Sequence, residues 1–422
     1  MLFCQVCRAV TEKFAFLFFV IFFISGCSPF RPLRIEPIES RPVYDDLFPY
    51  YVEVCALSRI KPKEGPKGGR AGHAVMYLKG ACVDPSVDYP AIAMCPEAAA
   101  LNGNERGVGI SVHQIFKNVN WVATPERDLF FYGQLPESEK LTEVKRRETI
   151  QKAIDLGIFR NVQIHESYLK GKPKEMATEE FIAAKSLGTD YGLNFGRSIL
   201  CVKIPVTGAM MKDIIVYLNQ RNQEYALTDE DYKWGALSDN CTHTIYNALA
   251  NAHMMSPRLI RAGRVRQFFN LALPANAVVA MTDLASPDPL DDIRKIEKNE
   301  KQRTTLLKYH WLPTRHGALL RTVMVHEKNE LYEVTTPGFE TMILRSRFFQ
   351  SRSRRLKQAF ADKRFTDLET NLRWFEKQYE TILSFCTAHL GSKKFDQEFL
   401  KTYCDYIAEQ LKDTRDKISK LK

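Results

Sequence analysis

The sequence predicts an α+β fold, and three features of the chain lead to that prediction. Apolar residues make up 45% of the 422 residues and charged residues 26%, the composition of a globular protein with a real core. From about residue 50 to residue 255, short β-type runs alternate with runs of helical apolar spacing. From about residue 356 onward, only the helical spacing remains.

Residues 1–27 have the pattern of an export signal. Two basic residues precede an unbroken apolar run of 11 residues, Phe14 to Ile24. A membrane-spanning helix needs about 20 apolar residues, so this run is too short to cross a bilayer. It ends in Ile-Ser-Gly-Cys, which resembles a bacterial lipobox and implies that Cys27 is lipidated. Because Ser28 rather than an aspartate follows, we expect a periplasm-facing lipoprotein of the outer membrane; the alternative is an ordinary signal peptide.

The next two segments are a tether and a mixed domain. Residues 28–49 are Pro-rich and polar, and we expect them to hold the folded body away from the membrane. Residues 50–255 form the predicted catalytic domain. Its clearest elements are strands at 75–78 and 199–204 and amphipathic helices at 144–156 and 211–225.

The C-terminal part is expected to contain two hairpins. Residues 256–344 include a charged, Pro-containing linker and then a predicted β-hairpin, with strands at 317–326 and 331–336. Residues 345–422 form a predicted basic helical hairpin that Gly391 interrupts. Cys386 and Cys404 flank that break, so two antiparallel helices would bring them together as a disulfide.

Cysteine usage supports export. Beyond Cys27 the chain has seven cysteines. In an oxidising compartment six of them can pair, and one thiol stays free.

Two short strings carry the chemistry. In residues 68–80 a Gly-rich segment precedes His73, which lies at the start of a predicted apolar strand. In residues 238–249, Asn240 is a good N-cap and places Cys241 in the first turn of a helix. Amides at a helix start favour a thiolate of lowered pKa and can hold an oxyanion. A nearby imidazole can take the thiol proton, and Cys241 would be the unpaired cysteine.

The order of these strings resembles the circularly permuted papain-like fold of the NlpC-type superfamily, in which a histidine strand precedes a cysteine helix. Asn-Cys-Thr-His-Thr-Ile is similar to a string of the lecithin:retinol acyltransferase branch, as is Gly-His-Ala-Val-Met-Tyr. Together with Gly-Ile-Ser-Val at 109–112, residues 118–123 and Asp-Tyr-Gly at 190–192, the pattern resembles an uncharacterised family of bacterial lipoproteins that includes lipoprotein N-acyltransferases. The resemblance covers about residues 50–255. It implies a covalent thioester on Cys241, activated by His73.

The third active-site residue is less clear from the sequence. We rank Asn120 first, because an asparagine can fix a histidine tautomer, with His113 and Asp88 as alternatives. His243 is expected to be structural. We expect no cofactor and no metal site, since the histidines at 310, 316 and 326 lack cysteine or carboxylate neighbours at ligand spacing. Candidates for an acyl groove are aromatic: Trp121, Phe130, Phe131, Phe195 and Trp234.

Positive charge is concentrated near the C-terminus. Residues 27–344 hold 40 basic and 38 acidic residues, whereas residues 345–422 hold 18 and 11. This distribution argues against a nucleic-acid binder. The basic patch is predicted to face an anionic membrane, and the alternative is a solvated helix start. Its members are Arg345, Arg347, Phe348, Phe349, Arg352, Arg354, Arg355 and Lys357.

The sequence therefore predicts an envelope lipoprotein that acts as a cysteine-dependent acyltransferase or hydrolase on membrane lipids or lipoproteins. Two alternatives stay open: a peptidoglycan peptidase or amidase, and a non-catalytic envelope scaffold. The oligomeric state and the acyl donor stay open as well.

Overall fold

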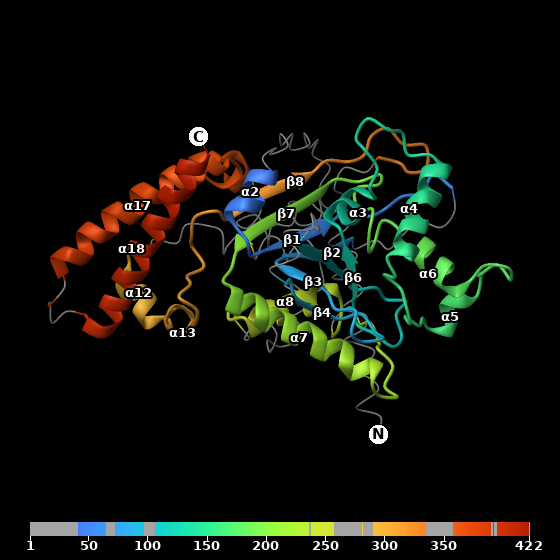
Figure 1. Cartoon of the computed structure of the whole chain (residues 1–422), viewed down its shortest axis with the longest axis horizontal. Helices are drawn as coiled ribbons and strands as arrows, with labels where there is room; N and C mark the ends of the chain where they lie inside the picture. Colours follow the sequence, from blue (N-terminus) through green and yellow to red (C-terminus); the bar gives the residue numbers. More distant parts are fainter. Residues whose placement is uncertain are drawn as a thin grey trace, which may run out of the picture.

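The computed structural model describes residues 41–64, 72–96, 106–235, 238–256, 281, 290–334, 358–389, 391 and 395–421 (Figure 1). Cys27, most of the tether and the whole basic patch at 345–357 lie outside these residues. Within them, no helix combines the length and the apolar character needed to cross a bilayer.

The α+β prediction is confirmed by a mixture of strands and helices in the described residues. The strands are β1 (Tyr51–Leu57), β2 (His73–Lys79), β3 (Ala81–Val83), β4 (Ile92–Met94), β5 (Gly107–Ser111), β6 (Val122–Pro125), β7 (Ile199–Pro205) and β8 (Leu319–Val323). The helices are α2 (Arg41–Leu47), α3 (Arg127–Tyr132), α4 (Glu143–Asp155), α5 (Glu166–Leu169), α6 (Thr178–Ser186), α7 (Gly208–Ala226), α8 (Cys241–Asn251), α12 (Ile293–Lys298), α13 (Glu300–Tyr309), α16 (Lys363–Thr366), α17 (Leu368–His389) and α18 (Gln397–Lys420).

A six-stranded antiparallel sheet forms the centre, in the order β6-β5-β2-β1-β7-β8. All seven residues of β1 are buried, because elements cover both faces of the sheet. On one face lie apolar side chains of α7 and α8, among them Met211 and Ile245. On the other face lie those of α2 and α3 and the ends of α17 and α18, among them Phe130 and Leu372. Figure 1 shows α7 and α8 below the sheet and α2 above it.

A buried cluster of charged side chains lies on the face of the sheet that α2 and α3 cover. Glu53 of β1 is fully buried and binds Arg127 of α3 and Arg321 of β8. The Arg127 guanidinium also lies 4.6 Å from the ring centre of Tyr77 and 4.5 Å from that of Phe131. Burial alone would raise the pKa of Glu53, but Arg127, Arg321 and Lys203 outweigh it and hold the pKa at about 2. Glu53 is therefore ionised and links three elements through its charge.

The predicted β-hairpin at 317–336 is wrong. The first strand forms as β8, but it pairs with β7, which lies more than 100 residues earlier in the chain. Of the expected second strand, the described residues 331–334 do not pair with β8, and Tyr332 bridges Pro62 instead. The reason is that β7 would otherwise expose an unpaired edge, and the apolar β8 covers it. The segment 256–344 thus contributes a strand to the sheet of the preceding domain.

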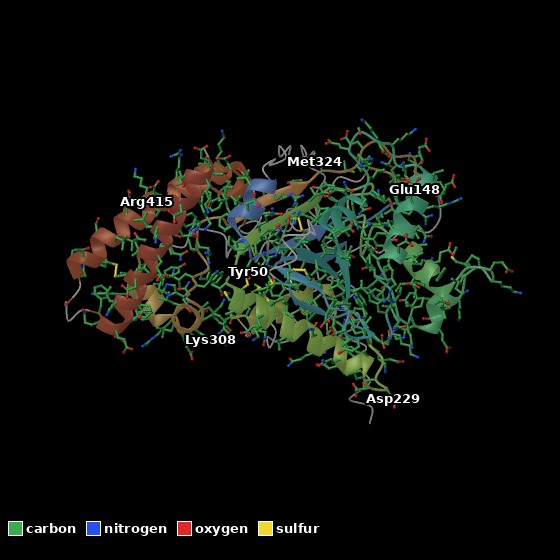
Figure 2. The ribbon with its side chains drawn as sticks, viewed as in Figure 1. Tyr50, Glu148, Asp229, Lys308, Met324 and Arg415 are labelled. Carbon is green, nitrogen blue, oxygen red and sulfur yellow. A yellow bond between two sulfur atoms is a disulfide. The ribbon has the colours of Figure 1, made fainter. Side chains whose placement is uncertain are left out.

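The helical hairpin and its disulfide are confirmed. Helices α17 and α18 are joined by a bond between Cys386 and Cys404, which Figure 2 shows in yellow toward the far end of the hairpin. Together with α12 and α13 they enclose an apolar cluster of their own. Two further disulfides join Cys55 to Cys201 and Cys82 to Cys95. Among the described cysteines, Cys241 alone is free, as the odd count required.

The ion cluster gives a first prediction. Glu53→Gln removes the negative charge and leaves the buried Arg127 and the largely buried Arg321 without their counter-charge, which should lower the free energy of unfolding by about 3–5 kcal/mol. Guanidinium denaturation followed by circular dichroism measures this loss. The control is Glu330→Gln, which breaks the exposed Lys140–Glu330 pair and should leave the midpoint almost unchanged. Equal midpoints for the two variants would contradict the role assigned to Glu53.

Candidate active site

Cys241 is the first residue of α8, as the sequence predicted. Asn240 caps the helix, and its side-chain oxygen accepts hydrogen bonds from the amides of Thr242 at 2.9 Å and His243 at 3.1 Å. Cys241 is 7% exposed. Asn240 therefore fixes the helix start. Its side chain also occupies two of the helix-start amides that were expected to bind an oxyanion.

The surroundings of the Cys241 thiol differ from the prediction in one respect. Burial raises the pKa of Cys241, and the amides of Ala74, Thr242 and Cys241 itself, with the Thr242 hydroxyl, offset this only in part. The predicted lowering of its pKa is therefore wrong, because the desolvation of a buried thiolate outweighs the helix start. The hydrogen bond from Ala74 nevertheless places the thiol beside the residue that follows His73.

His73 begins β2 and is hydrogen-bonded through Nε2 to Ser111 Oγ at 2.9 Å. Ser111 pairs with Val75 in the sheet register, so its side chain shares a face with His73, two residues away. The Ser111 hydroxyl donates to Asp190 Oδ1 at 2.5 Å or to the Thr189 carbonyl at 3.1 Å. In either case Ser111 Oγ must accept from Nε2–H of His73. The lone pair of Nδ1 is then available to take a proton.

Asp190 completes this chain of hydrogen bonds from the loop between α6 and β7. Burial would raise its pKa, but His113 and the hydrogen bonds from His113 and Ser111 lower it below the ordinary value. His113 Nδ1 lies 3.1 Å from Asp190 Oδ2. Asp190 is therefore ionised and fixes Ser111 and, through it, the imidazole of His73. The series His73–Ser111–Asp190 is called the relay below.

Burial also sets the protonation state of His73. It lowers the pKa of the imidazole to about 3; Asp190 opposes this effect, and Arg197 and His113 add to it. With the pKa of Cys241 raised, the resting pair is a neutral thiol and a neutral imidazole at neutral pH.

Asn120 does not lie beside His73. Its side-chain oxygen accepts a hydrogen bond from the Thr244 hydroxyl of α8 at 2.8 Å, and its backbone N–H donates to the side-chain oxygen of Asn222 of α7 at 2.8 Å. The structure thus places Asn120 in the packing between the sheet and these helices. The position expected for Asn120 is occupied by Ser111, and the alternative candidate His113 is the second partner of Asp190. Asp88 is exposed, and Asn161 binds its backbone carbonyl.

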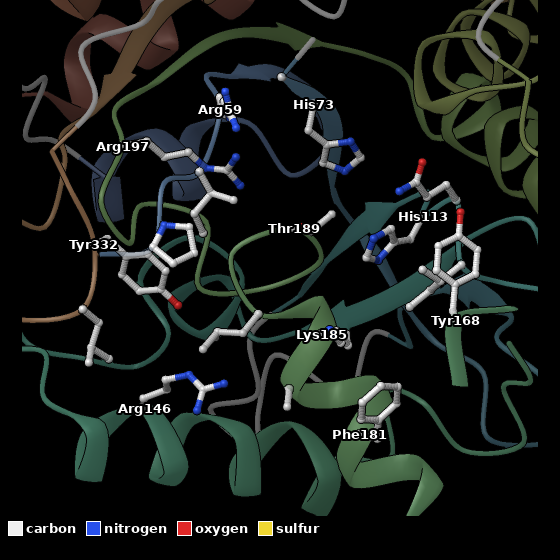
Figure 3. Close-up of a pocket in the computed structure, with 18 of the residues that line it drawn as sticks. Arg59, His73, His113, Arg146, Tyr168, Phe181, Lys185, Thr189, Arg197 and Tyr332 are labelled. Atoms are coloured by element: carbon white, nitrogen blue, oxygen red, sulfur yellow. The ribbon is translucent and has the colours of Figure 1, made fainter. Parts of the chain in front are cut away.

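A cavity of about 1230 Å³ opens onto both Cys241 and His73. Figure 3 shows His73, His113 and Arg197 on one side of it and Arg146 of α4 on the opposite side. Of the five aromatic candidates for an acyl groove, Trp234 lines the cavity, and the other four are buried elsewhere in the core. Apolar lining comes mostly from Ile60, Val112, Ile115, Ile164, Met176, Phe181, Leu187 and Leu331.

A metal is not supported by the described donors. The one cluster of potential ligands among the described residues is Glu53 with Cys55 and Cys201. Both sulfurs of that cluster are joined in a disulfide, so they are not thiolate ligands.

The neutral resting pair gives a second prediction. Without substrate, the rate at which iodoacetamide alkylates Cys241 should rise continuously with pH into the alkaline range, because the thiolate forms only above the ordinary pKa of a cysteine. A plateau between pH 4 and 8 would instead reveal a thiolate–imidazolium pair. Peptide mass spectrometry locates the label, and denatured protein provides the reference rate.

Comparison with known proteins gives no relative for this chain: no family model, no curated protein and no solved structure matches it.

Proposed function

We propose that the protein is a cysteine-dependent acyltransferase or hydrolase with a permuted papain-like core, in which Cys241 is the nucleophile and His73 the general base. One observation carries the proposal: a free thiol at a helix start and a histidine oriented by an ionised carboxylate open onto the same cavity. Ser111 and Asp190 act as positioning residues, since they touch His73 or each other and not the thiol.

The neutral resting pair sets the order of proton transfers. As Sγ of Cys241 bonds to the acyl carbon, its proton passes to Nδ1 of His73, and the relay holds Nε2–H in place. The acyl–oxygen bond then breaks, and the leaving alcohol takes that proton from Nδ1. An amine or water next gives its proton to Nδ1 and attacks the thioester. The sulfur leaves and recovers the proton.

The cavity supports an acyl chain as part of the substrate. Its apolar walls and its volume suit a fatty chain, and Trp234 adds an aromatic surface that is 40% exposed. If Cys27 is lipidated as proposed, the protein is held at a membrane, where such chains are abundant. Membrane lipids or lipoproteins are accordingly the proposed substrates, and the outer membrane is the proposed location.

A third prediction tests the proposed nucleophile. Full-length protein incubated with phospholipid vesicles and quenched in acid should carry one acyl group on Cys241, which intact-mass and peptide mass spectrometry detect. Hydroxylamine at neutral pH should remove it, because it cleaves thioesters. Cys241→Ala should carry none, and Cys241→Ser should react far more slowly. Acylation of the Cys241→Ala variant at the same rate would overturn the assignment.

A fourth prediction concerns the relay. Asp190→Asn removes the charge that orients Ser111 and His73, and kcat should fall about 100-fold or more, as when a triad carboxylate is lost. Alkylation of Cys241 at alkaline pH should be unchanged, because a preformed thiolate needs no base. A merely structural effect would change both.

Asn120→Ala serves as the control, since that side chain lies outside the relay. Folded Asn120→Ala protein should keep its kcat. If this variant loses activity while Asp190→Asn keeps it, the relay is assigned to the wrong residue.

A further inference from the structure

Arg197 is a buried cation on the wall of the cavity. It lies just before β7 and is 2% exposed. Its Nε donates to the carbonyl of Leu193 at 3.0 Å and its Nη1 to that of Ser58 at 2.7 Å. Nη2 has no hydrogen-bond partner, and Arg197 forms no ion pair with any carboxylate in the described part of the chain. Figure 3 shows its guanidinium group pointing toward the middle of the cavity.

Burying the Arg197 guanidinium with an incomplete set of hydrogen bonds costs free energy, which suggests that the group has a role beyond packing. A buried charge needs a counter-charge or a full set of hydrogen bonds, and Arg197 has only two neutral carbonyls. Burial lowers its pKa to about 9, and the attraction of Tyr332 and Asp190 compensates only in part. The two carbonyls hold the guanidinium plane in one orientation. They leave Nη2, itself a buried atom, without a hydrogen-bond partner among the described residues.

The position of Arg197 links it to the proposed reaction. Arg197 and His73 line the same cavity, and the charge of Arg197 contributes to the lowered pKa of His73. Ile60, Leu187 and Tyr332 line the same cavity. Arg146, on the opposite wall, already has a partner in Glu143 at 3.0 Å. A ligand that satisfies Arg197 thus places an anion beside the base and apolar groups along the wall.

We propose that Arg197 is the receptor for a singly charged oxyanion of the substrate, namely the phosphate diester of a phospholipid acyl donor. This inference rests on the proposed function, which requires an acyl group at Cys241. Lys63 and Lys185 also line the cavity, but both are exposed, whereas Arg197 is buried and has no carboxylate partner in the described part of the chain. A singly charged group suits this buried cation, and a phospholipid carries such a charge a few bonds from an acyl ester. The apolar walls receive the chain. A carboxylate has the same charge, and the experiment separates the two.

Binding is measured on the full-length Cys241→Ala variant through the change in tryptophan fluorescence, to which Trp234 on the cavity wall contributes. The three probes are dihexanoyl phosphatidylglycerol, neutral dihexanoylglycerol and N-hexanoylglycine. The phospholipid should bind about 10- to 100-fold more tightly than dihexanoylglycerol, as expected for a charge-assisted hydrogen bond. Arg197→Gln in the same background should abolish this preference and keep the affinity for dihexanoylglycerol. Arg146→Gln should retain the preference.

Three binding results would contradict the proposal or its assignment to phosphate. Equal affinity for phospholipid and dihexanoylglycerol with Arg197 intact overturns the proposal, even if Arg197→Gln does not fold. Tighter binding of N-hexanoylglycine than of the phospholipid overturns the assignment to phosphate, as does an unchanged preference in folded Arg197→Gln. Because Cys241→Ala has no nucleophile, these results do not depend on thioester formation. Failure of acylation at Cys241 would leave the binding result standing.

Discussion

The packing of the first turn of α8 against the start of β2 is the contact on which the site depends. It joins residues that lie 168 positions apart, and the amide of Ala74 donates to the sulfur of Cys241. The sheet register then brings Ser111 to His73, and the loop between α6 and β7 supplies Asp190. If α8 moved along β2, the thiol would lose its hydrogen bond from Ala74 while the relay stayed intact. The thiol of Cys241 and the imidazole of His73 are therefore positioned by different parts of the fold.

Two buried arginines differ in how their positive charge is compensated. Arg127 has a carboxylate partner and two aromatic rings, and it links the sheet to α3. Arg197 has only backbone carbonyls and faces a cavity. The first arrangement is complete without a ligand, whereas the second is not. The contrast between them is the strongest sign that the cavity is built to hold an anion.

Local patterns in the sequence revealed the parts of the site that depend on neighbouring residues. The cap Asn240, the helix start at Cys241 and the strand start at His73 follow from short-range preferences, and the Cys386–Cys404 bond follows from helical spacing. Ser111 and Asp190 stood in the strings Gly-Ile-Ser-Val and Asp-Tyr-Gly, but their contact with His73 depends on strand register and on a distant loop. The β-hairpin prediction at 317–336 failed for the same reason. The turn residues after β8 are a local pattern, whereas the pairing of β8 with the edge of β7 depends on a strand far away in the chain. The pKa of Cys241 depends on burial, which no local pattern measures.

The Cys55–Cys201 disulfide has a consequence for how the chain matures. The two residues stand directly opposite each other in the pairing of β1 with β7. Side chains alternate between faces along a strand, so a slip of one residue would turn one sulfur toward the opposite face. The bond closes readily only when β1 and β7 are correctly aligned. Cys55 and Cys201 lie 146 residues apart in the chain. Oxidation would therefore stabilise chains in which β1 and β7 are in the correct register, whereas chains with a slipped register would stay reduced.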